Sequence, residues 1–259
     1  MNMMRRFKLV LTVVFGLLVV SSFNTTASAK TTTTPTPSHA VLAHTASYYA
    51  QHELALITTY GIDLSYQTAY NSADHIWVYD QTHNKALHRS LRVAMANWNS
   101  KLGTKVFYAG TKKHHTMVVK LSDGKSNDGN QMAWWLPAAK TIQVDKSYYT
   151  SQLSFIDKYM KRRYSTAPET GLSAAKADAT IDATTANTAR TVEYSRVLTH
   201  ELGHTLGLTH SKNKTDLMYA GLAFDDIYSY QDVTNATIWA NPLSTTDIKR
   251  GQLAVKLAE

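Results

Sequence analysis

Residues 200–210 read His-Glu-Leu-Gly-His-Thr-Leu-Gly-Leu-Thr-His, which places three imidazoles and one carboxylate at close spacing. In an α-helix of about 3.6 residues per turn, His200 and His204 lie on one face, so one metal ion can contact both rings. Gly207 can adopt a positive φ without steric cost, which ends the helix and turns the chain. That turn brings His210 back as a third nitrogen ligand. The spacing therefore predicts a metal site made by His200, His204 and His210.

Three protein ligands leave the fourth tetrahedral position of a zinc ion to water, as in catalytic zinc sites, and zinc lowers the pKa of that water to about 7. Glu201 follows His200 directly and projects toward the edge of the same helix face. There it can take the water's proton and later pass it to a leaving amine. The pattern predicts one catalytic Zn²⁺, with Glu201 as general acid/base and not as a ligand.

A second His-Glu pair in the chain provides an internal comparison. His52-Glu53-Leu54-Ala55-Leu56 begins in the same way but has no histidine four residues after the first. We predict an ordinary pair on a helix surface there. At average residue usage, the full constellation at 200–210 is expected on the order of once in 10⁵ chains of this length, so it is far more specific than the short motif.

The extended histidine motif resembles that of the metzincin clan, and within it the matrixins, whose motif is followed by a methionine-containing turn. Ser211 follows the third histidine, as is typical of matrixins, and Leu217-Met218-Tyr219 is similar to the matrixin Met-turn. The resemblance implies a secreted, bacterial-type zinc metallopeptidase in which Met218 supports the base of the metal site and Gly207 supports its turn.

Two further stretches resemble the same family. Residues 243–248 are similar to the start of the helix that closes a matrixin catalytic domain, with Ser244 or a following threonine as N-cap. Residues 129–137 are similar to the stretch that leads into the matrixin edge strand. The chain differs from the family pattern after the Met-turn tyrosine, where Ala220 replaces the usual proline.

Other metal sites are not predicted. Ala133 stands where a matrixin carries a histidine of its second, structural zinc, so we expect a single zinc ion. His114 and His115 point to opposite faces if they lie on a strand, and we expect both to be solvated. The acidic residues that might hold calcium are too scattered to define a calcium loop, so calcium binding stays open but unsupported; they are Asp123, Asp128 and Asp145.

The elements that must position the metal site follow from hydrophobic patterns. Strand patterns occur at 75–80, 105–108, 117–121 and 141–145, and apolar residues at helical spacing occur between Leu87 and Trp98. The metal-binding helix is expected to begin near Thr191 and to bury Leu198, Leu202 and Leu206 on its opposite face. This order predicts an α+β zincin (metzincin) fold, with a twisted mixed β-sheet, two long helices including the active-site helix, a Met-turn and a C-terminal helix.

The expected organisation has three parts. Residues 1–29 are predicted to be a secretory signal cleaved after Ala29, because basic residues precede an apolar run and an Ala-Ser-Ala sequence. The apolar run of residues 9–20 is short for a membrane span, although an uncleaved anchor is the alternative. Residues 30–74 form a leader and N-terminal extension. The Thr/Pro-rich residues 30–38 are predicted to be a flexible or extended spacer, and residues 40–74 either a propeptide or a packed or loose extension. Residues 75–259 form the catalytic domain.

Within that domain an Ala/Thr-rich insertion is expected near 150–190. We interpret residues 165–190 as a surface insertion, with a lid or substrate-binding loop as the functional alternative. Trp134 and Trp135 lie before the expected edge strand, and we interpret them as packing residues rather than site residues, with lining of the cleft as the alternative. The loop at 220–242 is expected to shape cleavage preference. Its residues Asp225, Asp226, Tyr228 and Tyr230 either tune that preference or form a solvated acidic turn with packing tyrosines.

Composition limits the partners. The chain contains no cysteine, so it has no disulfides, and the cysteine-based latency of many matrixins is impossible. Without the three basic residues of the signal, 24 Lys and Arg stand against 19 Asp and Glu, which gives +5. Such a charge suits loose attraction to anionic cell surfaces, but no nucleic-acid motif accompanies it. We expect a monomer with a protein or peptide substrate, no nucleic-acid partner and no stable membrane insertion after signal cleavage.

These features predict a secreted, extracellular zinc endopeptidase that holds a substrate strand along a sheet edge, with association with the cell surface as a further option. Two alternatives use the same scaffold. One is a catalytically silent surface or binding protein, and the other is a zinc amidase acting on cell-wall peptide.

Overall fold

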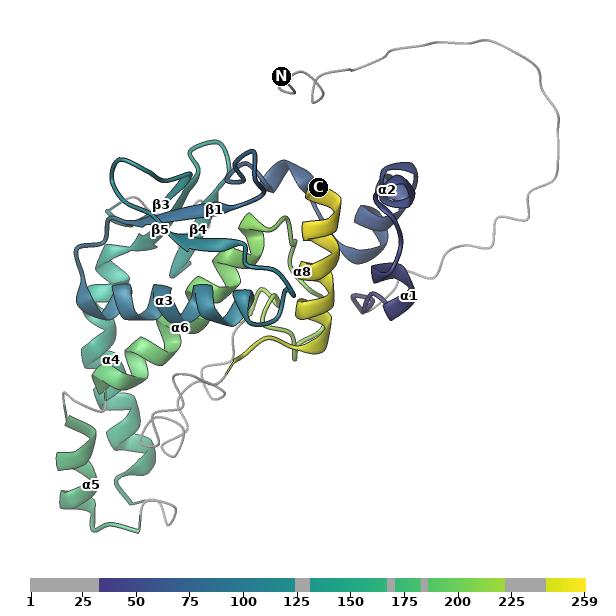
Figure 1. Ribbon diagram of the computed structural model, residues 1–259. Helices are drawn as coiled ribbons and strands as arrows, with labels where there is room; N and C mark the ends of the chain where they lie inside the picture. Colours follow the sequence, from purple (N-terminus) through teal and green to yellow (C-terminus); the bar gives the residue numbers. More distant parts are fainter. Residues whose placement is uncertain (1–32, 124–130, 167–170, 183–185, 222–240) are drawn as a thin grey trace, which may run out of the picture. The chain divides into compact units, whose positions relative to one another are not determined.

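The computed structural model of the protein describes residues 33–123, 131–166, 171–182, 186–221 and 241–259 (Figure 1). A five-stranded mixed sheet forms its framework, with the order β2-β1-β3-β5-β4. All neighbouring strands run parallel except β4, which pairs antiparallel with β5 and forms one edge. The strands are β1 (Ile76–Asp80), β2 (Phe107–Ala109), β3 (Met117–Ser122), β4 (Ala133–Leu136) and β5 (Thr141–Asp145). The predicted α+β class is confirmed.

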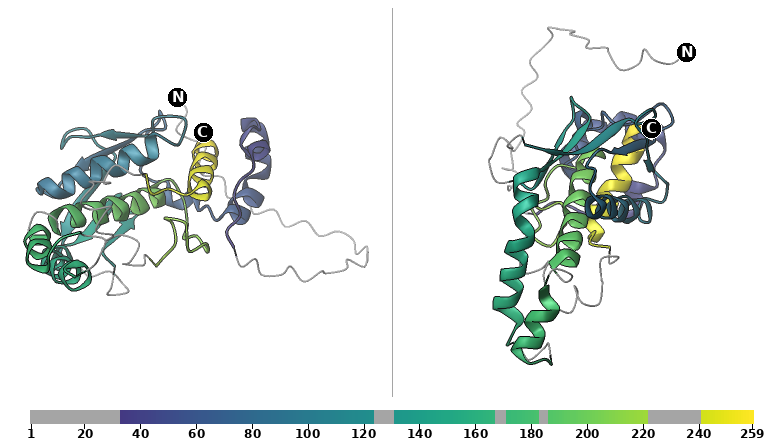
Figure 2. Two further views of the ribbon diagram at one scale, coloured as in Figure 1. Left: turned by 90° about the horizontal axis from the view of Figure 1, so that it is seen from below. Right: turned by 90° about the vertical axis from the view of Figure 1, so that its left-hand side faces the viewer.

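Two long helices, α3 (Lys85–Asn99) and α6 (Ala186–Thr205), lie on one face of the sheet, as Figures 1 and 2 show. Side chains alternate along a strand, so Ile76 and Val78 of β1 point toward these helices and are buried. Trp98 of α3 is fully buried, and its indole Nε1 donates to the carbonyl of Thr199 in α6 at 2.7 Å. Helix α6, which carries the histidine motif, is thus fixed against α3 on this face of the sheet.

The N-terminal extension packs onto the C-terminal helix α8 (Thr245–Ala258). It forms α1 (His39–Leu42), α2 (Ala46–Tyr60) and the short 3-10 helix η1 (Leu64–Tyr66). Four of its buried side chains belong to the main hydrophobic core; they are Tyr49, Leu56, Ile62 and Ala69. Residues 39–74 are therefore bound into the folded domain. His52 and Glu53 are exposed on α2.

Local capping signals place the ends of the helices that flank the site. Ser244 is the N-cap of α8 and forms a capping box with Asp247, because each side chain bonds to the other's backbone N–H. Asn84 caps α3 by accepting from the backbone of Ala86 and Leu87. The N-cap predicted at Ser244 is confirmed.

Two boundaries differ from the predicted ones by more than one residue. β2 begins at Phe107 rather than residue 105, because the backbone N–H groups of Val106 and Phe107 donate to the Asn99 side chain at 3.0 and 2.9 Å. The metal-binding helix α6 begins at Ala186, five residues before Thr191, since Ala and Thr residues that carry little hydrophobic pattern extend it.

The segment interpreted as a surface insertion contains helices with a small core of their own. α4 (Lys146–Tyr164) contacts α6, and α5 (Ala174–Thr180) contacts α4. Buried apolar residues from α4, from the start of α6 and from the end of α5 form a cluster separate from the main core; it consists of Ile156, Met160, Tyr164, Ile181, Ala186 and Ala189. The apolar positions of α4 are spread through a polar sequence, so the sequence analysis did not identify this helix.

The described part of the leader, residues 33–38, forms no helix or strand, but it is anchored to the domain. Thr34 and Pro37 are buried, and Thr34 exchanges hydrogen bonds with the Lys212 and Asn213 region. Composition predicted a flexible segment because threonine and proline bury little apolar surface, but backbone hydrogen bonds anchor this one. Residues 1–32, with the predicted signal, lie outside the described residues. None of the described helices is long and apolar enough to cross a membrane.

Candidate active site

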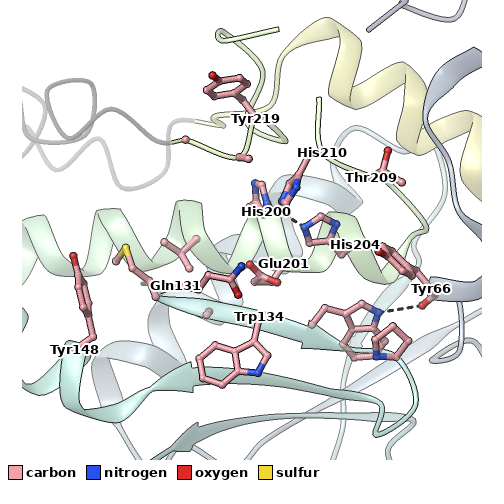
Figure 3. Close-up of a pocket in the computed structure, with 17 residues that line it drawn as sticks. Tyr66, Gln131, Trp134, Tyr148, His200, Glu201, His204, Thr209, His210 and Tyr219 are labelled. Atoms are coloured by element: carbon pink, nitrogen blue, oxygen red, sulfur yellow. Dashed lines mark hydrogen bonds between the residues drawn. The ribbon is translucent and has the colours of Figure 1, made fainter. Parts of the chain in front are cut away.

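Helix α6 places His200, Glu201 and His204 on the face that opens into a cleft (Figure 3). Its opposite side is fully buried, because Leu198 and Leu202, together with Leu206 just beyond the helix end, have no exposed surface. The helix ends at Thr205, and Gly207 adopts a φ of +96°, a conformation that glycine takes without a Cβ penalty. The chain then turns and returns His210 to the cleft.

The three imidazoles converge. The Nε2 atoms of His200 and His204 lie 3.1 Å apart, and metal-binding atoms of all three histidines lie within 4.8 Å of one another. Two nitrogens bound to one tetrahedral zinc at about 2.0–2.1 Å lie about 3.3 Å apart, so the spacing suits a shared ion. The triangle of rings is therefore already arranged for a metal.

The ring orientations are fixed by backbone carbonyls. His200 Nδ1 donates to the carbonyl of Leu217 at 2.7 Å, and His204 Nδ1 donates to that of Leu208 at 2.6 Å. A carbonyl oxygen only accepts, so each Nδ1 carries the proton and each Nε2 presents a lone pair. Two lone pairs that face each other at this distance repel unless a cation lies between them. The nitrogen donors, and the backbone carbonyls that orient their rings, therefore fit zinc.

Burial keeps these imidazoles neutral when no metal is bound. Desolvation lowers the pKa of His200 to about 4 and that of His204 to about 3. The pKa of the more exposed His210 is also lowered, first by burial and then by the positive charge of Arg250. Neutral imidazole is the form that binds metal, so the site does not have to release protons near pH 7.

The Met-turn lies against the metal-binding helix. Met218 is fully buried, and its Sδ packs so closely on Gly203 that a Cβ there would lie 2.4 Å from it. Asp247 of α8 accepts from the backbone N–H groups of Leu217 and Met218 at 2.7 and 3.3 Å. The same turn supplies the carbonyl that orients His200. Helix α8 therefore fixes the floor beneath the histidines through Asp247.

Glu201 is buried beside this group, with 7% of its surface exposed. Desolvation raises the pKa of its carboxyl to about 8, partly opposed by a hydrogen bond from the backbone of Trp135. Its Oε2 has no hydrogen-bond partner among the described residues. A buried, unsatisfied carboxylate oxygen in a cleft is available to a water molecule or a substrate group.

The cleft has a volume of about 860 Å³ and runs along the free edge of β4. The Met132 carbonyl accepts from Asp145 N at 3.0 Å and so faces β5. Because backbone groups alternate in direction along a strand, those of Ala133 and Trp135 point away from β5, toward the cleft. The hydrogen bond from Trp135 to Glu201 agrees with this. No strand of the described part of the chain pairs with this edge of β4, which lies beside the three histidines.

The remaining sequence predictions fall as follows. His114 and His115 are exposed, and Asp145 caps α4 while Asp123 pairs with Lys146. Ala133 is buried in β4, where it offers no metal ligand. Asp128 and the four residues named in the 220–242 loop lie outside the described residues.

Sequence reasoning did not assign to the site several aromatic residues that line the cleft, among them Tyr66, Trp134 and Trp135. We interpreted the tryptophans as packing residues. Trp135 does pack, with 8% of its surface exposed, but its backbone also contacts Glu201, and its indole Nε1 donates to the Tyr66 carbonyl at 3.2 Å. The only signal for this role was the position of the pair at the start of the expected edge strand.

The chain was compared with known families, curated proteins and solved structures. The family model for Matrixin matches residues 73–236, which is more than half of the chain. The matched region contains the sheet, α3 and the complete histidine motif. No curated protein and no solved structure matches the chain. The metzincin arrangement of the site and the family match agree, and the protein belongs to the matrixin family of zinc metallopeptidases.

Proposed function

We propose that the protein is a secreted endopeptidase that cleaves peptide bonds in an extended substrate. The observation that carries this proposal is the position of Glu201 and the histidine triad beside the free edge of β4. A peptide can add to that edge as a further strand, with main-chain hydrogen bonds to Ala133 and Trp135. This places successive peptide carbonyls past the three histidines.

His200, His204 and His210 would hold one zinc ion, which supplies a Lewis acid at the scissile carbonyl and lowers the pKa of water. Glu201 then takes a proton from the attacking water as the oxygen adds to the carbonyl carbon. It returns that proton to the leaving nitrogen as the C–N bond breaks, which balances the hydrolysis.

Hydrolysis of a quenched mixed-peptide library by the zinc-loaded protein, compared with Glu201→Gln, tests this function. The substitution keeps the side-chain size and removes the proton acceptor. General acid/base catalysis contributes about 10² to 10⁴-fold, so we expect a loss of that size with zinc content unchanged. Zinc binding without cleavage by the parent protein would favour the silent binding protein. Cleavage of purified wall fragments but not peptides would favour the amidase.

Secretion rests on the sequence of residues 1–29. Basic residues followed by a 12-residue apolar run and a small-residue cleavage site are typical of a secretory signal. Mass spectrometry of the protein recovered outside expressing cells should give a chain that begins at Lys30. Recovery of the intact chain in the membrane fraction would support the anchor instead.

A further inference from the structure

The loop between the second and third histidines, residues 206–209, is held by a segment far away in the sequence. We call residues 60–67 the N-terminal clamp. Asp63 N donates to the Gly207 carbonyl at 2.7 Å, and Thr209 N donates to the Gly61 carbonyl at 3.0 Å. Ile62 and Leu208 form an antiparallel bridge between these two bonds. The clamp therefore pairs with the residues that lead directly into His210.

Side chains strengthen the same contact. The Thr209 hydroxyl donates to the Gly61 carbonyl at 2.8 Å. Gln67, which is buried, donates through Nε2 to the carbonyls of Leu206 and Ala254, at 2.8 and 2.9 Å. One amide group thus ties the clamp to both the ligand loop and helix α8.

Arg250 of α8 joins the clamp to the ligand loop. Its guanidinium is fully buried and donates to three carbonyls, those of Tyr60 at 2.7 Å, Gly61 at 2.6 Å and Thr209 at 2.9 Å. These bonds are made by Nε and Nη2, whereas the buried Nη1 has no partner among the described residues. A buried cation depends on the hydrogen bonds that it does make, and two of these three acceptors belong to the clamp. The third acceptor belongs to the residue before His210.

The approach of these groups requires glycine at position 61. Gly61 ends α2 with a φ of +62°, and a Cβ at this position would lie 2.9 Å from Thr209 Oγ1 and 3.1 Å from Arg250 Nη2. A side chain here would push the clamp away from the ligand loop. Gly171 has nearly the same φ, +61°, but no heavy atom lies within 4 Å of its Cβ position. It offers a matched control for backbone strain.

We propose that the N-terminal clamp and Arg250 are positioning groups for the third metal ligand, His210, which makes the N-terminal extension an integral part of the metal site. Both lie outside residues 73–236, which the family model matches. The inference rests on the proposed zinc peptidase function. It also selects between the two interpretations of residues 40–74, because a propeptide that is removed would take the clamp with it.

The first test is the N-terminus of the active enzyme. Mass spectrometry of the secreted, active protein should find a species that retains residues 60–67, whatever processing occurs upstream of them. An active form that begins after residue 74 and has the same kcat/KM as the longer chain would overturn the proposal.

The second test measures zinc affinity by chelator competition, and the visible spectrum of the cobalt-substituted protein, on full-length variants. Thr209→Val removes one hydroxyl with little change in shape, Gly61→Ala adds one methyl group, and Arg250→Lys keeps the charge but loses the fork of donors. Changes of partners outside the metal ligands typically cost about 10 to 100-fold in metal affinity or activity. We expect a loss in this range for Gly61→Ala, a smaller loss for the other two, and a change within about twofold for Gly171→Ala.

The cobalt spectrum and the kinetics separate positioning from a general loss of stability. A displaced His210 should alter the cobalt absorption and lower kcat, while KM stays close to that of the parent because the β4 edge is untouched. If Gly61→Ala does not fold, Thr209→Val and Arg250→Lys decide the question. Zinc affinity and cobalt spectra equal to the parent's in the folded variants would overturn the proposal. If the parent binds zinc without cleaving peptides, the peptidase function fails while the zinc comparison still tests the clamp.

Discussion

Gly203 lies in α6 between the two histidines of the helix and should not tolerate alanine. In an ordinary helix interior, Gly→Ala stabilises by about 0.5–1 kcal/mol. Here the added Cβ would lie 2.4 Å from Met218 Sδ and 3.0 Å from Trp98 Cζ2, whereas carbon atoms in contact lie about 3.5–4.0 Å apart. Met218 is flexible in principle, but it is fully buried, so it moves only if its neighbours move. Overpacking of this kind costs about 1–3 kcal/mol and exceeds the helix gain.

We therefore predict a net loss of stability of about 1–2 kcal/mol for Gly203→Ala, a fall in Tm of about 2–8 °C for a chain of this size. Zinc affinity should fall as well, by about 10 to 100-fold, because Met218 adjoins Leu217, whose carbonyl orients His200. Differential scanning calorimetry and chelator competition measure the two effects.

Gly251→Ala is a matched control for this prediction. Its Cβ would lie 2.6 Å from Trp98 Cζ3 and 3.1 Å from Leu102 Cδ2, so it overpacks the same tryptophan from α8, without contact to the Met-turn. We expect a similar fall in Tm with unchanged zinc affinity. In a double-mutant cycle, Met218→Ala should partly relieve Gly203→Ala, so that the combined loss is smaller than the sum. A Gly203→Ala variant as stable as the parent, with the same zinc affinity, would refute the packing argument.

Three further predictions concern the same site. Asp247→Asn removes the charge from hydrogen bonds to Leu217 N and Met218 N, and urea unfolding should show a loss of about 1.5–3 kcal/mol; unchanged stability would mean that Asp247 does not hold the Met-turn. Removal of zinc by a chelator should lower Tm, because an ion present at 1,000 times its Kd stabilises by about 4 kcal/mol, and a Tm independent of zinc would contradict binding to the native state. In the zinc-free protein, burial raises the pKa of Glu201 from 4.5 to about 8. The protonated carboxyl therefore contributes stability that is fully present below pH 4.5 and is lost as the pH rises through 8. Glu201→Gln should reduce the fall in unfolding free energy between pH 6 and pH 9, and an equal fall in both proteins would exclude Glu201 as its source.

Short-range patterns in the sequence were sufficient to predict much of the catalytic centre. The positions of His200 and His204 on one helix face, the buried leucines opposite them and the turn at Gly207 all follow from helix geometry and glycine's backbone freedom within about three turns of chain. Ser244 was recognisable as an N-cap for the same reason. These features depend on neighbours in the sequence, and local stereochemistry determines them.

Tertiary structure decided the contacts that join distant segments. The bond from Trp135 to Glu201, the bonds from Asp247 to the Met-turn and the pairing of the N-terminal clamp with the ligand loop join residues 30 to 148 positions apart. The anchored leader and the small core between α4 and α6 belong to the same class. No periodicity marks such pairs, because which polar groups meet depends on how the helices pack against the sheet. The sequence alone thus determined the chemistry of the metal ligands, and only the packed chain decided which segments hold those ligands in place.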